Sequence, residues 1–168
     1  MKIHPHQLID TTLLGSSSFH FLEEPSQIVH QINELLDLRE KAGINGKPLI
    51  IWEPLPSSCT PDNLNAFCNA ARSVDVLSPN HVELAGIVGK YEESLFEKDL
   101  IEELALAFLQ SGVGESAQGA VVVRAGEHGC LVQSNDQSTR HKYEYLQPTL
   151  TSSIRLKYTR PPTLRPSR

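Results

Sequence analysis

Two short stretches of the chain combine polar side chains with spacing that could support chemistry. In the first, Asn80-His81-Val82-Glu83, an amide and a carboxylate follow a short apolar run. This spacing is typical of a helix start in which Asn80 caps the helix and Glu83 reaches back to the cap. A helix start after a strand could also attract phosphate, and the two side chains could hold a magnesium ion through water. The two interpretations are compatible, and the residues alone favour the cap.

The second stretch, Arg124-Ala125-Gly126-Glu127-His128-Gly129, follows another apolar run. Its two glycines predict a hairpin turn with positive φ angles. The functional alternative is a turn whose backbone contacts a nucleotide, with Arg124 near phosphate. Two glycines three residues apart are a weak signal by themselves, so the hairpin turn is the favoured interpretation.

Other candidates are assigned structural roles. The run Gly112-Val113-Gly114-Glu115 follows a helix and precedes a strand, the wrong end of a sheet for a phosphate loop, so we interpret it as a helix stop and linker. His4 and His6 have no third metal ligand nearby. Trp52 stands in an apolar run and is predicted to belong to the core.

The three cysteines, Cys59, Cys68 and Cys130, are an odd number without metal-ligand spacing. They indicate buried or idle thiols in a reducing compartment, and neither Cys59 nor Cys68 has an identified histidine partner for nucleophilic catalysis. No apolar run is long enough to cross a bilayer, and no secretory signal follows Met1. We therefore expect a cytoplasmic protein without a membrane partner.

The elements that must position these residues alternate along the chain. Apolar runs predict strands at 19–22, 49–52, 74–77 and 120–123, with a hairpin partner at 130–132. Helical spacing and stop signals predict helices over 26–41, from 60 to about 71, from 80 to about 89, and over 97–111. This order predicts βαβ units and a mostly parallel sheet covered on both faces, a three-layer αβα fold. Ligands of such sheets bind beyond the strands' carboxyl ends, here the loops 53–60, 78–83 and 124–129.

The size and charge of the chain predict one domain and a tail. Its 168 residues are 39% hydrophobic and 21% charged, which is typical of a globular domain and excludes a wholly disordered chain, collagen or a coiled coil. Residues 1–139 carry 8 basic and 19 acidic side chains, whereas residues 140–168 carry 7 basic side chains and one acidic. The acidic body therefore disfavours binding to nucleic acid. The tail contains prolines and is predicted to be mostly disordered. Only the tail would bind a polyanion, and it would do so non-specifically.

Three segments together resemble the PfkB/ribokinase family of carbohydrate kinases. They are LIIWEP at 49–54, VDVLSPNHVEL at 74–84 and VVVRAGEHGC at 121–130, and the resemblance covers roughly residues 15–135. It implies a ribokinase-like fold, ATP with Mg²⁺, and transfer of the γ-phosphoryl group of ATP to a sugar or related alcohol.

The resemblance also implies roles for single residues. Asn80 and Glu83 match the family's N-x-x-E motif, associated with phosphate and magnesium, so Glu83 is the expected metal residue. Gly126 and Gly129 match the turn near the nucleotide, and Arg124 stands where many members have a hydroxyl residue. Asn80, Arg124, Gly126 and Gly129 are thus the expected nucleotide-binding residues. Glu53 stands where many members have Asp.

Two parts of the family pattern are missing from the sequence. Only 18 residues precede Phe19, too few for the glycine-rich sugar-binding half, and no G-x-G-D loop follows Gly129, the last glycine. That loop supplies the anion hole and the general base, so we assign no catalytic residue. We expect an incomplete, truncated ribokinase-like domain that is inactive alone. The alternatives are a non-enzymatic α/β ligand-binding or interaction module, and a partial gene product without function.

Overall fold

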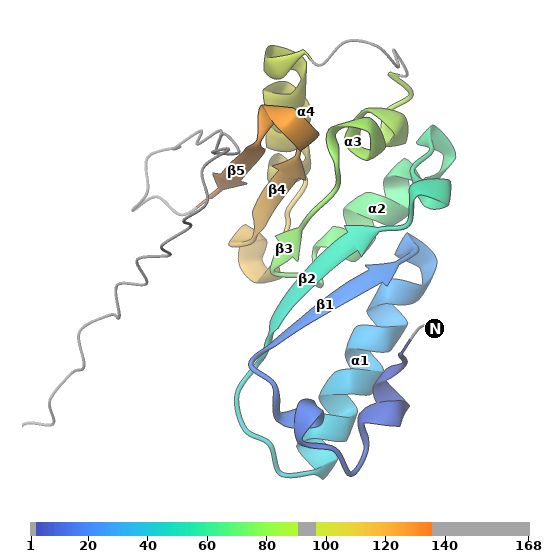
Figure 1. Ribbon diagram of the computed structural model, residues 1–168, viewed down its shortest axis with the longest axis vertical. Coiled ribbons are helices and arrows are strands. Elements are labelled where there is room, and N and C mark those ends of the chain that lie inside the picture. Colours follow the sequence, from blue (N-terminus) through green and yellow to red (C-terminus); the bar gives the residue numbers. More distant parts are fainter. Residues whose placement is uncertain (1–2, 91–96, 136–168) are drawn as a thin grey trace, which may run out of the picture.

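A five-stranded sheet organises the computed structural model, which describes residues 3–90 and 97–135 (Figure 1). Its strands stand in the order of the sequence: β1 (Ser18–Glu23), β2 (Leu49–Pro54), β3 (Val76–Leu77), β4 (Ala120–Arg124) and β5 (Cys130–Ser134). The first four are parallel, and β5 returns antiparallel to β4. The predicted α/β fold with a mostly parallel sheet is therefore confirmed. The tail predicted for residues 140–168 lies outside the described residues.

Within these described ranges, four α-helices connect the strands near the predicted positions: α1 (Pro25–Lys41), α2 (Leu64–Ala71), α3 (His81–Ile87) and α4 (Lys98–Gln110). The helix predicted to start at Thr60 begins differently, with a 3-10 turn over Pro61–Asn63 before α2. The Thr60 hydroxyl makes no cap bond to the backbone and instead accepts a hydrogen bond from the Asn63 side chain at 3.4 Å. None of these helices is long and apolar enough to span a membrane, as far as the described residues extend.

The helices of the described residues pack on one face of the sheet. Crossovers of one hand place successive helices on the same face when neighbouring strands follow the sequence without reversal, and Figure 1 shows the helices behind the sheet. The covered face carries fully buried side chains, namely Ile50, Trp52, Leu77, Val121, Val123 and Leu131. On the opposite face, Leu22, Leu49 and Val132 are 50%, 45% and 38% exposed. The described residues thus supply two of the three layers, and the expectation that both faces are covered is not met within them.

Trp52 is part of the core, as predicted. Its side chain is fully buried and its ring stacks on Phe67 with the ring centroids 5.2 Å apart. The indole N–H donates to the carbonyl oxygen of Glu23 at 2.9 Å, so the polar atom of this buried ring is satisfied. The contact ties the end of β1 to β2, close to the carboxyl ends of the parallel strands.

A buried arginine holds the other end of the domain together. Arg39 of α1 is 5% exposed. Its guanidinium donates to the carbonyl oxygens of Leu14 at 2.6 Å, Ser16 at 2.9 Å and Gly46 at 3.3 Å. These bonds fix two segments of irregular backbone to α1. One of them contains the 3-10 turns Pro5–Leu8 and Thr12–Gly15, which the sequence analysis did not predict.

Candidate functional site at the carboxyl edge of the sheet

The two stretches singled out from the sequence meet at the carboxyl edge of the sheet. Beyond the regular ladder between β3 and β4, Asn80 and Arg124 form a further parallel bridge. The backbone N–H of Arg124 donates to the carbonyl oxygen of Pro79 at 3.0 Å. The start of α3 and the start of the β4–β5 turn are therefore side by side, as expected for neighbouring parallel strands.

Asn80 and Glu83 form the predicted capping box. The Asn80 Oδ1 accepts the backbone N–H of Glu83 at 2.8 Å, and the Glu83 Oε2 accepts the backbone N–H of Asn80 at 2.7 Å. Both side chains thus satisfy backbone groups at the start of α3. The favoured structural role of this motif, the helix cap, is therefore confirmed.

The Arg124 guanidinium contacts oxygen atoms from three different segments. One nitrogen of its guanidinium, Nη2, lies 2.9 Å from Oε1 of Glu53 and 3.5 Å from Oε2 of Glu83. The same nitrogen donates to the carbonyl oxygen of Ser78 at 3.3 Å. The arginine side chain is 42% exposed, whereas Glu83 is only 6% exposed. The guanidinium therefore neutralises a nearly buried carboxylate and links the ends of β2, β3 and β4.

His20 extends this row of polar contacts to β1. Its Nε2 lies 3.2 Å from Oε2 of Glu53, so both carboxylate oxygens of Glu53 have a nitrogen neighbour. The sequence analysis did not identify His20 as part of the site. The available signal was the alternation of β1, which places His20 on the opposite side of the strand from Phe19 and Phe21. Only the register, in which Leu22 pairs with Glu53, shows that His20 and Glu53 share a face.

The turn between β4 and β5 has the predicted glycine geometry. Gly126 and Gly129 have φ angles of 57° and 91°, and a short 3-10 turn over Gly126–His128 lies between β4 and β5. The backbone N–H of Ala125 donates to the carbonyl oxygen of Gly129 at 2.8 Å and closes the turn. A Cβ atom at Gly126 would meet nothing within 4 Å. The backbone of this turn is therefore open to a close approach by a ligand.

The cysteines near this edge do not provide a nucleophile. Burial, with the nearby charge of Glu83, raises the pKa of the Cys59 thiol to about 12. Burial also raises the pKa of Cys130, although the charge of Arg124 acts in the opposite direction. Cys59, Cys68 and Cys130 form no disulfide with one another. Thiolate chemistry at neutral pH is therefore disfavoured at Cys59 and Cys130.

The carboxylates of this edge do not form a ready set of metal ligands. Within residues 3–90 and 97–135, no three His, Cys, Asp or Glu side chains are grouped so that they could hold a metal ion. The Glu83 Oε2 already accepts the N–H of Asn80 and faces Arg124, and both oxygens of Glu53 are engaged by Arg124 and His20. A directly bound Mg²⁺ requires near-octahedral oxygen ligands at about 2.0–2.1 Å. The residues present do not fit a directly bound ion while Arg124 holds this position.

The run over 112–115 lies at the opposite end of β4, as expected for a helix stop and linker. Gly114 has a φ of 81°, and a Cβ atom there would lie 2.6 Å from the backbone nitrogen of Gly119. Its N–H donates to the carbonyl oxygen of Ala71 at 3.0 Å. Gly114 therefore serves close packing of the backbone.

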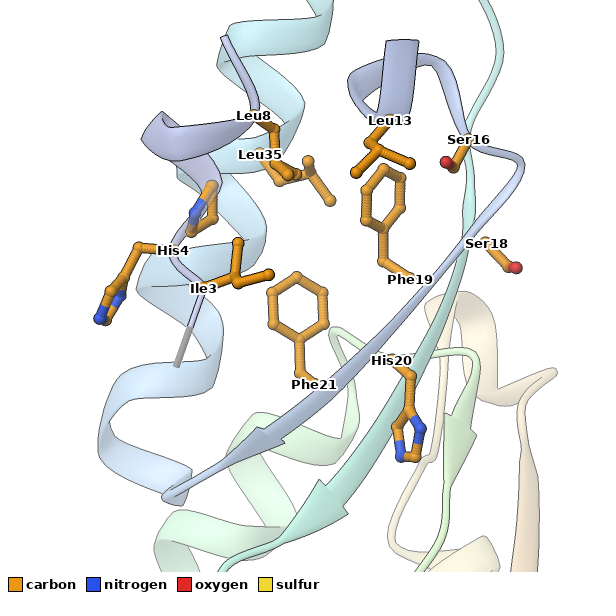
Figure 2. A pocket seen from close by; sticks show the side chains of 11 residues that line it. Ile3, His4, Leu8, Leu13, Ser16, Ser18, Phe19, His20, Phe21 and Leu35 are labelled. Carbon is orange, nitrogen blue, oxygen red and sulfur yellow. The ribbon is translucent and has the colours of Figure 1, made fainter. Parts of the chain in front are cut away.

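A pocket of about 260 Å³ lies between the N-terminal 3-10 turns, β1 and α1. Its lining is mostly apolar, and Figure 2 shows Phe19 and Phe21 on one side of β1 and His20 on the other. The rings of His4 and His6 stack near it, 5.7 Å apart. None of the five residues expected to bind nucleotide or metal lines this pocket.

Comparisons with known proteins give distant and partial relatives. No family model matches the chain. An uncharacterized protein of Schizosaccharomyces pombe is 31% identical over 147 residues, which are 87% of this chain and 39% of that protein. Protein MAK32 of Saccharomyces cerevisiae is 33% identical over 109 residues, 56% of this chain and 30% of that protein. The chain thus spans less than half the length of the curated relatives it matches.

The fold has a counterpart among solved structures. The ribokinase of Giardia lamblia matches with a TM-score of 0.57 at 12% identity, over 86% of this chain and 40% of that enzyme. A likeness at this identity concerns the fold alone. The chain therefore has a ribokinase-like fold, which resembles that of carbohydrate kinases.

Proposed function

We propose that this chain forms the nucleotide-binding side of a carbohydrate-kinase-like protein. The observation that carries the proposal is the bridge between Asn80 and Arg124, which joins the N-x-x-E segment to the glycine turn at the carboxyl edge of the sheet. Parallel α/β sheets bind ligands at this edge. The ribokinase-like fold supports the same assignment.

The expected ligand is ATP or ADP, with its phosphates over the β4–β5 turn. No oxygen of the described residues accepts a hydrogen bond from Nη1 of Arg124, whose side chain is 42% exposed, so this nitrogen is available to a phosphate. The open backbone at Gly126 allows the phosphates to approach. Asn80 lies next to Arg124 at the bridge, so we expect it beside the phosphates.

The binding should be weak, because two carboxylates oppose the negative phosphates. Glu53 and Glu83 both lie within 4 Å of the guanidinium that would attract the ligand. We therefore expect a Kd near or above 1 mM, which corresponds to about 4 kcal/mol. The Mg²⁺ expected with ATP has no direct protein ligand in this arrangement, because Glu83 is engaged by Asn80 and Arg124.

The phosphoryl acceptor, a sugar or related alcohol, belongs to this proposal only as a substrate of a complete protein. The 168 residues contain no G-x-G-D loop and hence no assigned general base. The proposed location is the cytoplasm, since cysteines that form no disulfide with one another fit a reducing compartment.

The proposal is tested by titrating ATP into the full chain and into two glycine variants, with ligand-observed NMR. Gly126→Val narrows the open turn, whereas Gly43→Val is a matched control, since Gly43 also has a positive φ and open space around it. We expect Gly126→Val to weaken ATP binding at least fivefold and Gly43→Val to leave it unchanged. Equal affinities of the two variants would contradict the assignment.

A non-enzymatic interaction module is the second candidate. The observation that favours it is the sheet face left uncovered by the described residues, where Leu22 and Leu49 are 50% and 45% exposed. Absence of any ATP binding by the full chain at several millimolar would favour this candidate over the first.

A further inference from the structure

We infer that the Arg124 guanidinium takes the place of a divalent cation between Glu53 and Glu83, so that the chain does not recruit a metal ion at this edge. A single nitrogen of Arg124 lies 2.9 Å from one carboxylate and 3.5 Å from the other. This is the bridging position that a cation shared by the two side chains would occupy. The inference deepens the proposed function and rests on it for the identity of the ligand.

Three of the four carboxylate oxygens of Glu53 and Glu83 already have partners. Glu53 uses Oε1 toward Arg124 and Oε2 toward His20. Glu83 uses Oε2 for the Asn80 N–H and for Arg124, and its side chain is 6% exposed. A metal ion would have to displace the guanidinium and break part of the helix cap.

Arg124 makes further contacts in addition to its ion pairs with the two carboxylates, and a metal ion would have to compete with all of them. Its backbone N–H is bonded to Pro79 at 3.0 Å, and Nη2 donates to Ser78 at 3.3 Å in addition to the two ion pairs. The guanidinium is a permanent charge with a fixed arrangement of donors that matches carboxylate oxygens. The guanidinium thereby reduces the repulsion between the like charges of Glu53 and Glu83 without a metal.

Two consequences follow for the chemistry of this edge. Any nucleotide bound here should meet the protein through the remaining guanidinium nitrogen, so its affinity should not depend on added Mg²⁺. Removal of the arginine should uncover two carboxylates that attract a divalent cation. Arg124→Ser removes the positive charge and leaves a small polar side chain.

The inference is tested with Mn²⁺ alone, without nucleotide, by measuring free Mn²⁺ with electron paramagnetic resonance on the full chain. We expect Arg124→Ser to bind Mn²⁺ at least tenfold more tightly than the unmodified protein. The double variant Arg124→Ser/Glu83→Gln should lose that gain. Arg124→Lys keeps a positive charge in place and should behave like the unmodified protein. Circular dichroism verifies that each variant is folded.

The inference is overturned if the unmodified chain binds Mn²⁺ as tightly as Arg124→Ser, or if the gain persists in the double variant. If Arg124→Ser fails to fold, the Mn²⁺ affinity of Glu83→Gln, made in the otherwise unmodified chain, tests the inference instead. An unchanged Mn²⁺ affinity then supports the inference, and a fivefold loss overturns it. In a separate experiment, ATP is titrated into the full chain in the presence of Mg²⁺ or of a chelator. Lack of ATP binding under both conditions would refute the proposed function but would not affect the Mn²⁺ result.

Discussion

Arg124 Nη2 on β4 lies 2.9 Å from Glu53 Oε1 on β2, across the short strand β3 that separates them. The pair joins two strands that make no ladder with each other. It also places the only arginine of the β4–β5 turn region at the edge where a nucleotide is proposed to bind. The charge balance of this edge is therefore set by side chains from three strands and one helix.

The capping box predicts a measurable loss of stability in Asn80→Ala. Removing the Asn80 side chain leaves the N–H of Glu83 without its acceptor at 2.8 Å. We expect the free energy of unfolding to fall by about 1 kcal/mol. Asn80→Asp should retain most of the unfolding free energy. Asn45→Ala, at an exposed position, is the matched control. Urea unfolding measures all three, and equal losses for Asn80→Ala and Asn45→Ala would count against the cap.

Replacement of Arg39 should be more damaging than replacement of any exposed arginine. Arg39→Ala leaves the carbonyl oxygens of Leu14, Ser16 and Gly46 without their charged donor. We expect a loss of roughly 2–4 kcal/mol in unfolding free energy. Arg72→Ala, on the exposed surface, should change it by less than about 0.5 kcal/mol. The prediction fails if thermal and urea unfolding of the two variants coincide.

The Cys59 thiol should react slowly in the folded chain. Its pKa of about 12, against 9.0 for an unperturbed thiol, lowers the thiolate fraction at pH 8 roughly a thousandfold. Since the folded pKa is raised, the unfolded state loses the proton first. The contribution of Cys59 to stability should therefore be complete below about pH 9 and decline as the pH rises toward 12.

Iodoacetamide labelling followed by peptide mass spectrometry checks this prediction. Cys68, which is only partly buried, serves as the internal control. Labelling of Cys59 at the rate of Cys68 in the native chain would contradict it, whereas both should label equally in urea.

The isolated chain should not transfer phosphoryl groups from ATP. The carboxylates at the proposed site are engaged by Arg124, His20 and the Asn80 backbone, and none is assigned as a general base for an acceptor hydroxyl. A coupled assay of ADP release over a panel of sugars and nucleosides measures this. Acceptor-dependent turnover that disappears in Glu83→Gln would refute the prediction.

Several features could be predicted from the sequence because they depend on local patterns. The apolar runs at 49–52 and 120–123 predicted β2 and β4, and the spacing of Asn80 and Glu83 predicted the capping box. The meeting of Asn80 with Arg124 followed from the parallel arrangement of neighbouring strands.

Other features depend on strand order and register, which local patterns do not contain. The ion pair of Arg124 with Glu53 crosses β3, and the pairing of Glu53 with His20 requires the register of β1 on β2. The one-sided packing of the helices follows from a strand order without reversal. The bonds of Arg39 to three carbonyl oxygens join segments that carry no sequence signal for that contact.

The most direct test of the central claim, nucleotide binding at the carboxyl edge of the sheet, is a titration of the ¹⁵N-labelled full chain with ATP or ADP, followed by amide NMR shifts. We expect saturable shifts, with a midpoint near or above about 1 mM, centred on residues 80–83 and 124–129 and unaltered by a metal chelator. Shifts that avoid both segments and fall instead on the residues of the pocket around Phe19 and Phe21, or no shifts at all, would contradict it.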